Sequence, residues 1–262
     1  MRRYLRLFGM FVRTCLVKEL EFRGNFWVGS FVGAAWVGVY LAVAHIIYSN
    51  TSSVGGWSKG QMVMLLGTYT LSFGLISVFF SRNLAELPNQ VRTGTFDFTL
   101  VKPVNSQFFV SLRYLNFTEF GTVAAATALV VYGAVLGHVH ITVLGALEYV
   151  AMLTCGVVIF YCIYLLMMTS AFWFVKVDNL WTLAETVTQV ARTPMNIYGL
   201  FAQRFFTFVL PLIFIAHIPA KALFRGVEPR EAALAVTMCV ALLFVSSRFW
   251  NFATRFYSSA SS

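Results

Sequence analysis

Long apolar runs separated by short polar stretches fill most of this chain. Four of the runs hold 20 or more residues with few charges, which is the length that a helix needs to cross the hydrocarbon core of a membrane. Two further runs are shorter, and Pro211 and Pro219 interrupt the first of them. The pattern predicts a single domain over residues 1–262, an all-α integral membrane protein with six transmembrane helices at 26–48, 61–80, 114–136, 143–175, 205–220 and 232–247.

Basic residues gather on one side of this topology. If the first residues are cytoplasmic, residues 82–113 and 173–205 form two cytoplasmic loops. Four of the 19 lysine and arginine residues then fall outside (Lys59, Lys221, Arg225 and Arg230), and the others, Lys176 included, fall inside. Because basic residues favour the cytoplasmic side, we expect both termini in the cytoplasm. Nothing in the sequence points to a eukaryotic source, so a bacterial inner membrane is the expected location.

Composition supports the same class. Only 11% of the residues are charged, against 59% that are hydrophobic, whereas a soluble domain carries about 25% charged residues. The net charge of +9 is explained by basic residues that face anionic lipid on the cytoplasmic side. We therefore expect membrane lipid, and no nucleic acid, among the partners.

Residues 2–23 have a helical pattern of their own. Arg2, Arg6 and Arg13 fall on one arc of a helical wheel, and apolar residues lie opposite. This arrangement predicts an amphipathic helix that lies in the cytoplasmic membrane interface. Lys18 and Glu19 interrupt the apolar face toward the end, and a solvated tail is the alternative.

The loop at 82–113 begins with a short amphipathic segment. Leu84, Leu87 and Val91 recur at helical spacing, Pro88 is expected to kink or split the helix, and Gly94 can adopt the left-handed conformation that ends one. Such a short helix needs a surface to lie against. That surface is either the protein's own inner face and the lipid headgroups, or a partner protein.

Three sequence blocks carry a family resemblance. The first is "VRTGTFDFTLVKPVN", the second is "GGWSKGQMVMLLG", and the third is "TPMNIYGLFAQRFFTFVLPLIFIAHIPAKALF". Taken in their order along the chain (second, first, third), they resemble one branch of the type-2 ATP-binding-cassette (ABC) exporter permeases. In the first block the matching residues are Arg92, Gly94, Phe96, Asp97, Leu100, Lys102, Pro103 and Val104.

The resemblance implies a half-transporter with six helices and cytoplasmic termini, working with two ABC ATPase subunits and a second permease chain, identical or related. The N-terminal amphipathic helix would form part of the gate, and residues 219–231 would belong to a re-entrant outer connection. The first cytoplasmic loop would contain a coupling helix that docks into the ATPase. The residues assigned to that helix are Asn83, Leu84, Glu86, Leu87, Pro88, Gln90, Val91 and Arg92.

Motifs for catalysis are missing from the sequence. It has no GxxxxGK[ST] phosphate loop, so ATP and Mg²⁺ are expected on a separate ATPase, and this chain is expected to bind no cofactor. The histidines and the cysteines form no metal-binding motif. We therefore expect a transport subunit without an enzymatic site.

Glu119 is the acidic residue that bears most on transport. With Asn116 and Thr118 it is a candidate for a polar transport path; alternatively, its carboxylate reaches the inner headgroups or pairs with Arg113. Two other patterns also leave alternatives. Gly29 and Gly33 allow close helix packing within the chain or across a dimer. Residues 180–191 have apolar helical spacing, which fits an extension of the fourth helix or a second ATPase contact.

The leading hypothesis is a permease subunit of an ATP-driven ABC exporter, with the translocation path at a dimer interface. The alternative is an ATP-independent secondary carrier or channel, for which we would expect inverted repeats and ionisable residues near the membrane midplane. The sequence has no visible repeat of that kind. Its apolar composition favours an amphiphilic, drug-like or lipid-like cargo.

Overall fold

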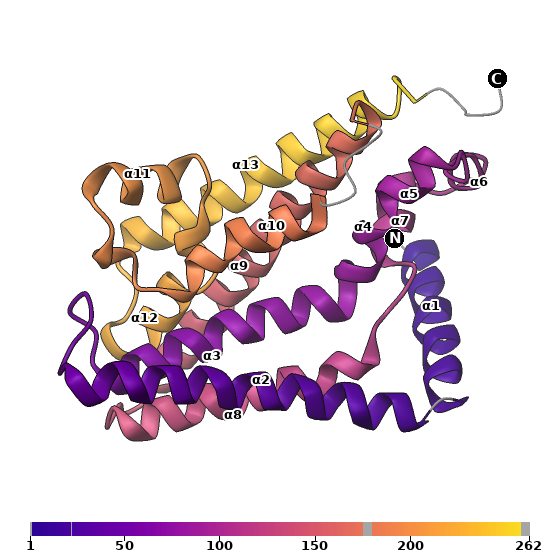
Figure 1. Cartoon of the computed structure of the whole chain (residues 1–262). Helices are drawn as coiled ribbons and strands as arrows, with labels where there is room; N and C mark the ends of the chain where they lie inside the picture. Colours follow the sequence, from indigo (N-terminus) through magenta and orange to yellow (C-terminus); the bar gives the residue numbers. More distant parts are fainter. Residues whose placement is uncertain (1, 22, 175–179, 258–262) are drawn as a thin grey trace.

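The computed structural model describes residues 2–21, 23–174 and 180–257. These residues form helices and turns, without a strand among them (Figure 1). The longer helices are α1 (Arg2–Glu21), α2 (Arg23–Asn50), α3 (Lys59–Ile76), α8 (Phe120–Leu136), α9 (Val143–Thr169) and α13 (Pro229–Ala253). The shorter ones are α4 (Arg82–Ala85), α5 (Leu87–Arg92), α6 (Asp97–Leu100), α7 (Ser106–Leu112), α10 (Leu180–Thr188), α11 (Leu200–Phe208) and α12 (His217–Arg225).

Five helical stretches of the described chain are long and apolar enough to cross a membrane. They are Phe26–Asn50, Lys59–Arg92, Phe117–Leu136, Val143–Phe172 and Pro229–Ala253. The predicted all-helical membrane architecture is thus confirmed. The predicted number of six is not reached by helices of this length.

Helix α3 is the centre of the bundle. In its most apolar part 78% of the residues are buried, whereas in the corresponding parts of α2 and α13 only 11% of the residues are buried. Helices α2, α8, α9 and α12 pack around it, and Met64, Leu65 and Ile76 on α3 are fully buried. Through a π-helical turn at Ser77–Ser81, α3 continues into α4. One nearly continuous rod therefore joins the two ends of the bundle (Figure 1).

Both ends of the described chain lie at the same end of the bundle. The Arg3 Nη2 atom donates to the Pro103 carbonyl at 2.7 Å, and the Tyr257 hydroxyl donates to the Gly94 carbonyl at 3.1 Å. We call this end, which holds α4 to α7, the coupling end. The opposite end, with residues 51–58 and α12, is the far end (Figure 1).

The predicted fifth span at 205–220 is divided into short pieces. Helix α11 is followed by a 3-10 turn at Leu212–Phe214 and then by α12. Pro211 stands at the break, where a residue without an N–H cannot continue a helix. Pro219 lies in the first turn of α12, where proline is tolerated. This region therefore folds back at the far end instead of crossing as one helix (Figure 1).

Residues 180–196, within the loop expected at 173–205, lie along the bundle. Helix α10 runs beside α9, with the rings of Tyr164 and Trp181 centred 4.6 Å apart. Farther along, the Asn196 side chain donates to the Gly55 carbonyl at 3.2 Å, which places residue 196 at the far end. Polar side chains within 182–192 lower the mean hydropathy and hide this segment from a search for apolar runs. Lys176 lies outside the described residues.

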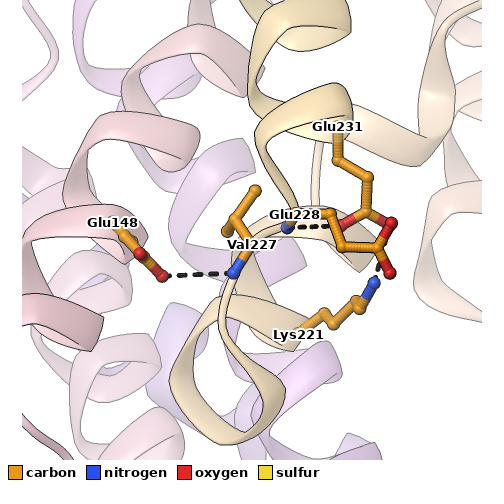
Figure 2. Close-up of polar contacts among 5 residues, drawn as sticks. All are labelled: Glu148, Lys221, Val227, Glu228 and Glu231. Atoms are coloured by element: carbon orange, nitrogen blue, oxygen red, sulfur yellow. Dashed lines mark hydrogen bonds and ion pairs between the residues drawn. The ribbon is translucent and has the colours of Figure 1, made fainter.

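Acidic side chains close the turn between α12 and α13 at the far end. Lys221 Nζ forms an ion pair with Glu231 at 2.6 Å, and the other oxygen of Glu231 accepts from the Glu228 amide at 3.2 Å. Glu148 on α9 accepts from the Val227 amide, also at 3.2 Å. Figure 2 shows that these contacts converge on one turn. They fix the region 219–231, where a re-entrant connection was expected, to α9.

Candidate functional site

The segment after α3 has the predicted break. Helix α4 ends at Ala85, and α5 begins at Leu87 with Pro88 in its first turn, where proline is tolerated because that N–H has no helical partner. After α5, Gly94 has φ +74°, a left-handed conformation that favours glycine. The chain therefore turns sharply from α5 toward α6.

The apolar stripe of this segment faces the protein itself. Leu84 and Leu87 are completely buried in the main core, Val91 packs against the same core, and Asn83 and Gln90 are buried as well. For this stripe, the protein's own surface is the correct alternative. These five residues, assigned to the ATPase contact by resemblance, hold the segment against the bundle, and Gln90 also lines the hollow that Glu86 and Phe98 share.

Asn83 holds the segment to the chain that follows α7. Its side-chain amide donates to the Tyr114 carbonyl at 2.6 Å and to the Phe79 carbonyl at 3.0 Å. Its side-chain oxygen accepts from the Tyr114 amide at 2.9 Å. The side chain thus hydrogen-bonds to three backbone groups at this junction.

The exposed side of α4 and α5 is polar. Asn89 donates to Glu86 Oε1 at 2.8 Å and accepts from Arg92 Nη2 at 3.1 Å. Phe98 and Val101 nearby are 70% and 78% exposed, and Phe98 lines one hollow together with Glu86. We call these five residues the docking face. The sequence prediction included Glu86 and Arg92 but missed Asn89, although the three recur every third position.

Phe96 of the signature loop is an aromatic anchor. It is completely buried, and its ring centroid lies 5.3 Å from Phe172, 6.0 Å from Trp250 and 5.2 Å from Tyr257. Burial raises the pKa of Tyr257, and the neighbouring Asp97 raises it further. The loop is thus packed against the ends of α9 and α13. A displacement of the loop would therefore change its packing on both helices.

Lys102 packs the same loop against α7, and Pro103 connects it to α1. The Lys102 Nζ atom lies 3.9 Å from the centroid of the Phe109 ring, a favourable cation–π geometry. Partial burial lowers the pKa of Lys102, and Arg113 lowers it further. The Pro103 carbonyl accepts from Arg3, as described above. This hydrogen bond attaches α1 to the loop.

Asn116 and Thr118, two of the three candidate path residues, have structural contacts. Thr118 donates to Asn116 Oδ1, and Ser30 on α2 donates to the Thr118 carbonyl at 3.1 Å. A Cβ atom on Gly29 would lie 3.1 Å from the Cβ of Thr118. Close packing of α2 through this glycine is therefore formed within the chain, against the 3-10 turn at Phe117–Glu119 that precedes α8.

Glu119 lines a cavity of about 610 Å³ between α2, α3, α8 and the segment that contains α10. We call it the α2 cavity. Its volume falls within the range of small-molecule sites, about 300–1,000 Å³. Polar side chains that the prediction missed share its wall; they are Thr70, Thr122, Glu185, Gln189 and Arg192.

The spacing of Glu185, Gln189 and Arg192 was the available signal, because positions i, i+4 and i+7 share one helix face. The described residues hold no group of three or more His, Cys, Asp or Glu side chains suited to a metal ion.

Comparison with known protein families identifies the chain. The family model described as "ABC-2 family transporter protein" matches residues 34–261, which include the segment 83–104 and the α2 cavity except for its N-terminal edge at Gly29–Gly33. Comparisons with curated proteins and with solved structures gave no match. The family match confirms the resemblance seen in the three sequence blocks, and it agrees with the spanning helices. This multi-pass membrane chain therefore belongs to the ABC-2 family of transporter proteins.

Proposed function

We propose that the chain is the permease subunit of an ATP-driven ABC exporter. The observation that carries this proposal is the docking face: a polar patch with two exposed apolar side chains, on a segment whose own apolar stripe is already buried. ATP and Mg²⁺ belong, in this proposal, to a partner ATPase of the ABC type, because the sequence has no phosphate loop.

Six membrane crossings agree best with the path of the chain. Arg3 and Tyr257 both reach the coupling end, so the chain between them crosses an even number of times, whereas five stretches are of spanning length. The segment from Leu180 to Asn196 supplies the additional crossing. Helices α11 and α12 then form the re-entrant connection at the far end, in place of a fifth span at 205–220.

The proposed orientation places the coupling end in the cytoplasm of a bacterial cell, with α1 at the inner membrane interface. Two permease chains, identical or related, pair with two ATPase subunits. Helices α2 and α13 expose broad apolar faces such as Trp27, Phe31 and Val240. These faces suit contact with lipid and with the second permease chain. The translocation path is expected at the interface between the two permease chains.

Force from the ATPase would enter at the docking face. Closure of the two ATPase subunits displaces α5, and the rod formed by α3 and α4 carries that displacement toward the far end. The Phe96 anchor transmits it to α9 and α13 at the same time. ATP drives the change to the extent that it binds one state of the complex more tightly than the other.

A charge reversal tests the docking face. We expect Glu86→Lys combined with Arg92→Glu to reduce the amount of ATPase that copurifies with the tagged permease by about tenfold or more, because one charge-assisted contact is worth that much. Arg204→Glu, an exposed position on α11, is the matched control and should keep the ATPase. Full assembly and nucleotide-dependent export by the double variant would overturn the proposal.

The ATP-independent carrier or channel is the second candidate, and the charged α2 cavity is the observation in its favour. Solute movement in vesicles that contain this chain and no ATPase separates the two. Transport at the full rate without nucleotide would support the carrier, whereas strict dependence on ATP and the ATPase subunit would support the exporter.

A further inference from the structure

The α2 cavity carries charges of both signs within the membrane-spanning bundle. Glu119 and Glu185 supply carboxylates, and Arg192 supplies a guanidinium. Among the residues that the structure describes, none of the three takes part in an ion pair. All three side chains are partly buried, and ionisable side chains between membrane-spanning helices are costly and mark ligand or ion sites. A ligand with complementary charges would offset that cost.

Arg192 is held in place by aromatic rings. Its guanidinium carbon lies 5.0 Å from the centroid of the Tyr40 ring and 4.8 Å from that of Tyr69. Its Nε atom is buried and has no hydrogen-bond partner in the described part of the chain. A guanidinium fixed in this way is suited to a phosphate or a carboxylate, which accept paired hydrogen bonds from it.

The two carboxylates favour a cation on another part of the wall. Glu185 lies on α10, whereas Arg192 ends the 3-10 turn Gln189–Arg192 that follows, so a helical rise of 1.5–2.0 Å per residue separates them by roughly 10–14 Å along the axis. Glu119 stands at the start of α8, and the Trp36 ring lines the same cavity. Carboxylates and an aromatic face together suit an ammonium group. The cavity therefore offers one subsite for an amine and a second, separate subsite for an acid.

An apolar groove continues from the cavity along α2. It has a volume of about 170 Å³ and is lined by Phe31, Val32, Ala35, Trp36 and Val39. Val32 and Trp36 line both spaces, so the groove and the cavity adjoin. A molecule with a charged head in the cavity can lay an apolar chain in the groove.

We infer that the α2 cavity binds the headgroup of a zwitterionic amphiphile, a single-chain or two-chain lipid-like molecule that carries an amine and an acid group. The amine faces Glu119 and Glu185, the acid faces Arg192, and the apolar chain follows α2. This inference rests on the proposed transport function, because it identifies the occupant as the cargo class.

Binding to the full-length chain in a neutral detergent tests the inference. The probes are lysophosphatidylethanolamine (amine and phosphate), lysophosphatidylglycerol (phosphate alone) and an alkylamine (amine alone), with equal chain lengths and the same fluorescent label on the chain. We expect the first to bind about tenfold tighter than either of the others, the effect of one additional charge-assisted contact.

Charge variants should change the preference in opposite directions. Arg192→Gln should remove the advantage of lysophosphatidylethanolamine over the alkylamine, and Glu119→Gln with Glu185→Gln should remove its advantage over lysophosphatidylglycerol. Arg204→Gln, exposed and outside the cavity, is the matched control. Val32→Trp, an exposed substitution at the junction of cavity and groove, should weaken all three probes in a protein that stays monodisperse.

Equal affinity of the wild type for the three probes, or equal effects of Arg192→Gln and Arg204→Gln, would overturn the inference. ATPase copurification is measured on the same preparations. An assembled complex without charge preference refutes only the cargo class, whereas failure of the wild type to bind an ATPase refutes the proposed function.

Discussion

At the scale of single residues, Leu87 and Asn89 show that the short helix α5 has one side buried in the bundle and one side exposed. Leu87 is completely buried in the core of the bundle, whereas Asn89, two positions later, is exposed and bridges Glu86 and Arg92. Periodicity correctly separates the two kinds of position. It does not tell whether the apolar side meets the protein or a partner, because hydrophobic burial has no direction.

Alanine substitutions should separate folding from docking. Leu87→Ala is expected to lower the free energy of unfolding by about 2–5 kcal/mol, as for other large-to-small changes in a core. Asn89→Ala should change it by less than about 0.5 kcal/mol and weaken ATPase copurification. Thermal unfolding in detergent and pull-down yield measure the two effects. Equal stability of the two variants would contradict the burial of Leu87.

At the scale of helices, the sequence predicts the first four spans well, because each is apolar over 20 or more residues with few charges. It also indicates a helix at 180–191, where α10 lies, but Glu185, Gln189 and Arg192, which line a cavity, keep that segment from being predicted as a span. A search for apolar length excludes such a helix. Glu119 stands out in the sequence because it interrupts an apolar run, whereas Glu185, Gln189 and Arg192 lie among other polar residues.

The packing of α2 on α8 gives a test at this scale. A Cβ atom on Gly33 would collide with the Thr122 hydroxyl, behind which the Thr122 Cβ lies 3.1 Å away, and a β-branched side chain has little freedom to turn aside. Gly33→Ala should therefore cost about 1–3 kcal/mol of stability.

Gly38→Ala on the same helix is the matched control, because nothing lies within 4 Å of an added Cβ there. It should leave the melting temperature unchanged or raise it slightly, given the helix propensity of alanine. If both variants melt at the same temperature, α2 does not pack on α8 as described.

At the scale of the whole molecule, the bundle has two chemically different ends. Labelling of single cysteines with a membrane-impermeant maleimide, in a background without the native cysteines, tests which residues share an end. Asn89→Cys should react from one side of the membrane. Ser53→Cys and Asn196→Cys should both react from the other, because Asn196 contacts Gly55. Labelling of residues 89 and 196 from the same side would restore the loop expected at 173–205.

The Phe96 anchor also has a consequence for biosynthesis. Gly94 and its partner Tyr257 are separated by 163 residues, so the ribosome makes the loop long before the helix that holds it. Until α13 has been synthesised and inserted, Phe96 lacks two of its ring partners, Trp250 and Tyr257, and closing the long chain between them costs entropy only when that contact forms. We therefore expect the loop beside the docking face to reach its final packing, and the proposed ATPase to bind stably, only after the last helix has been inserted.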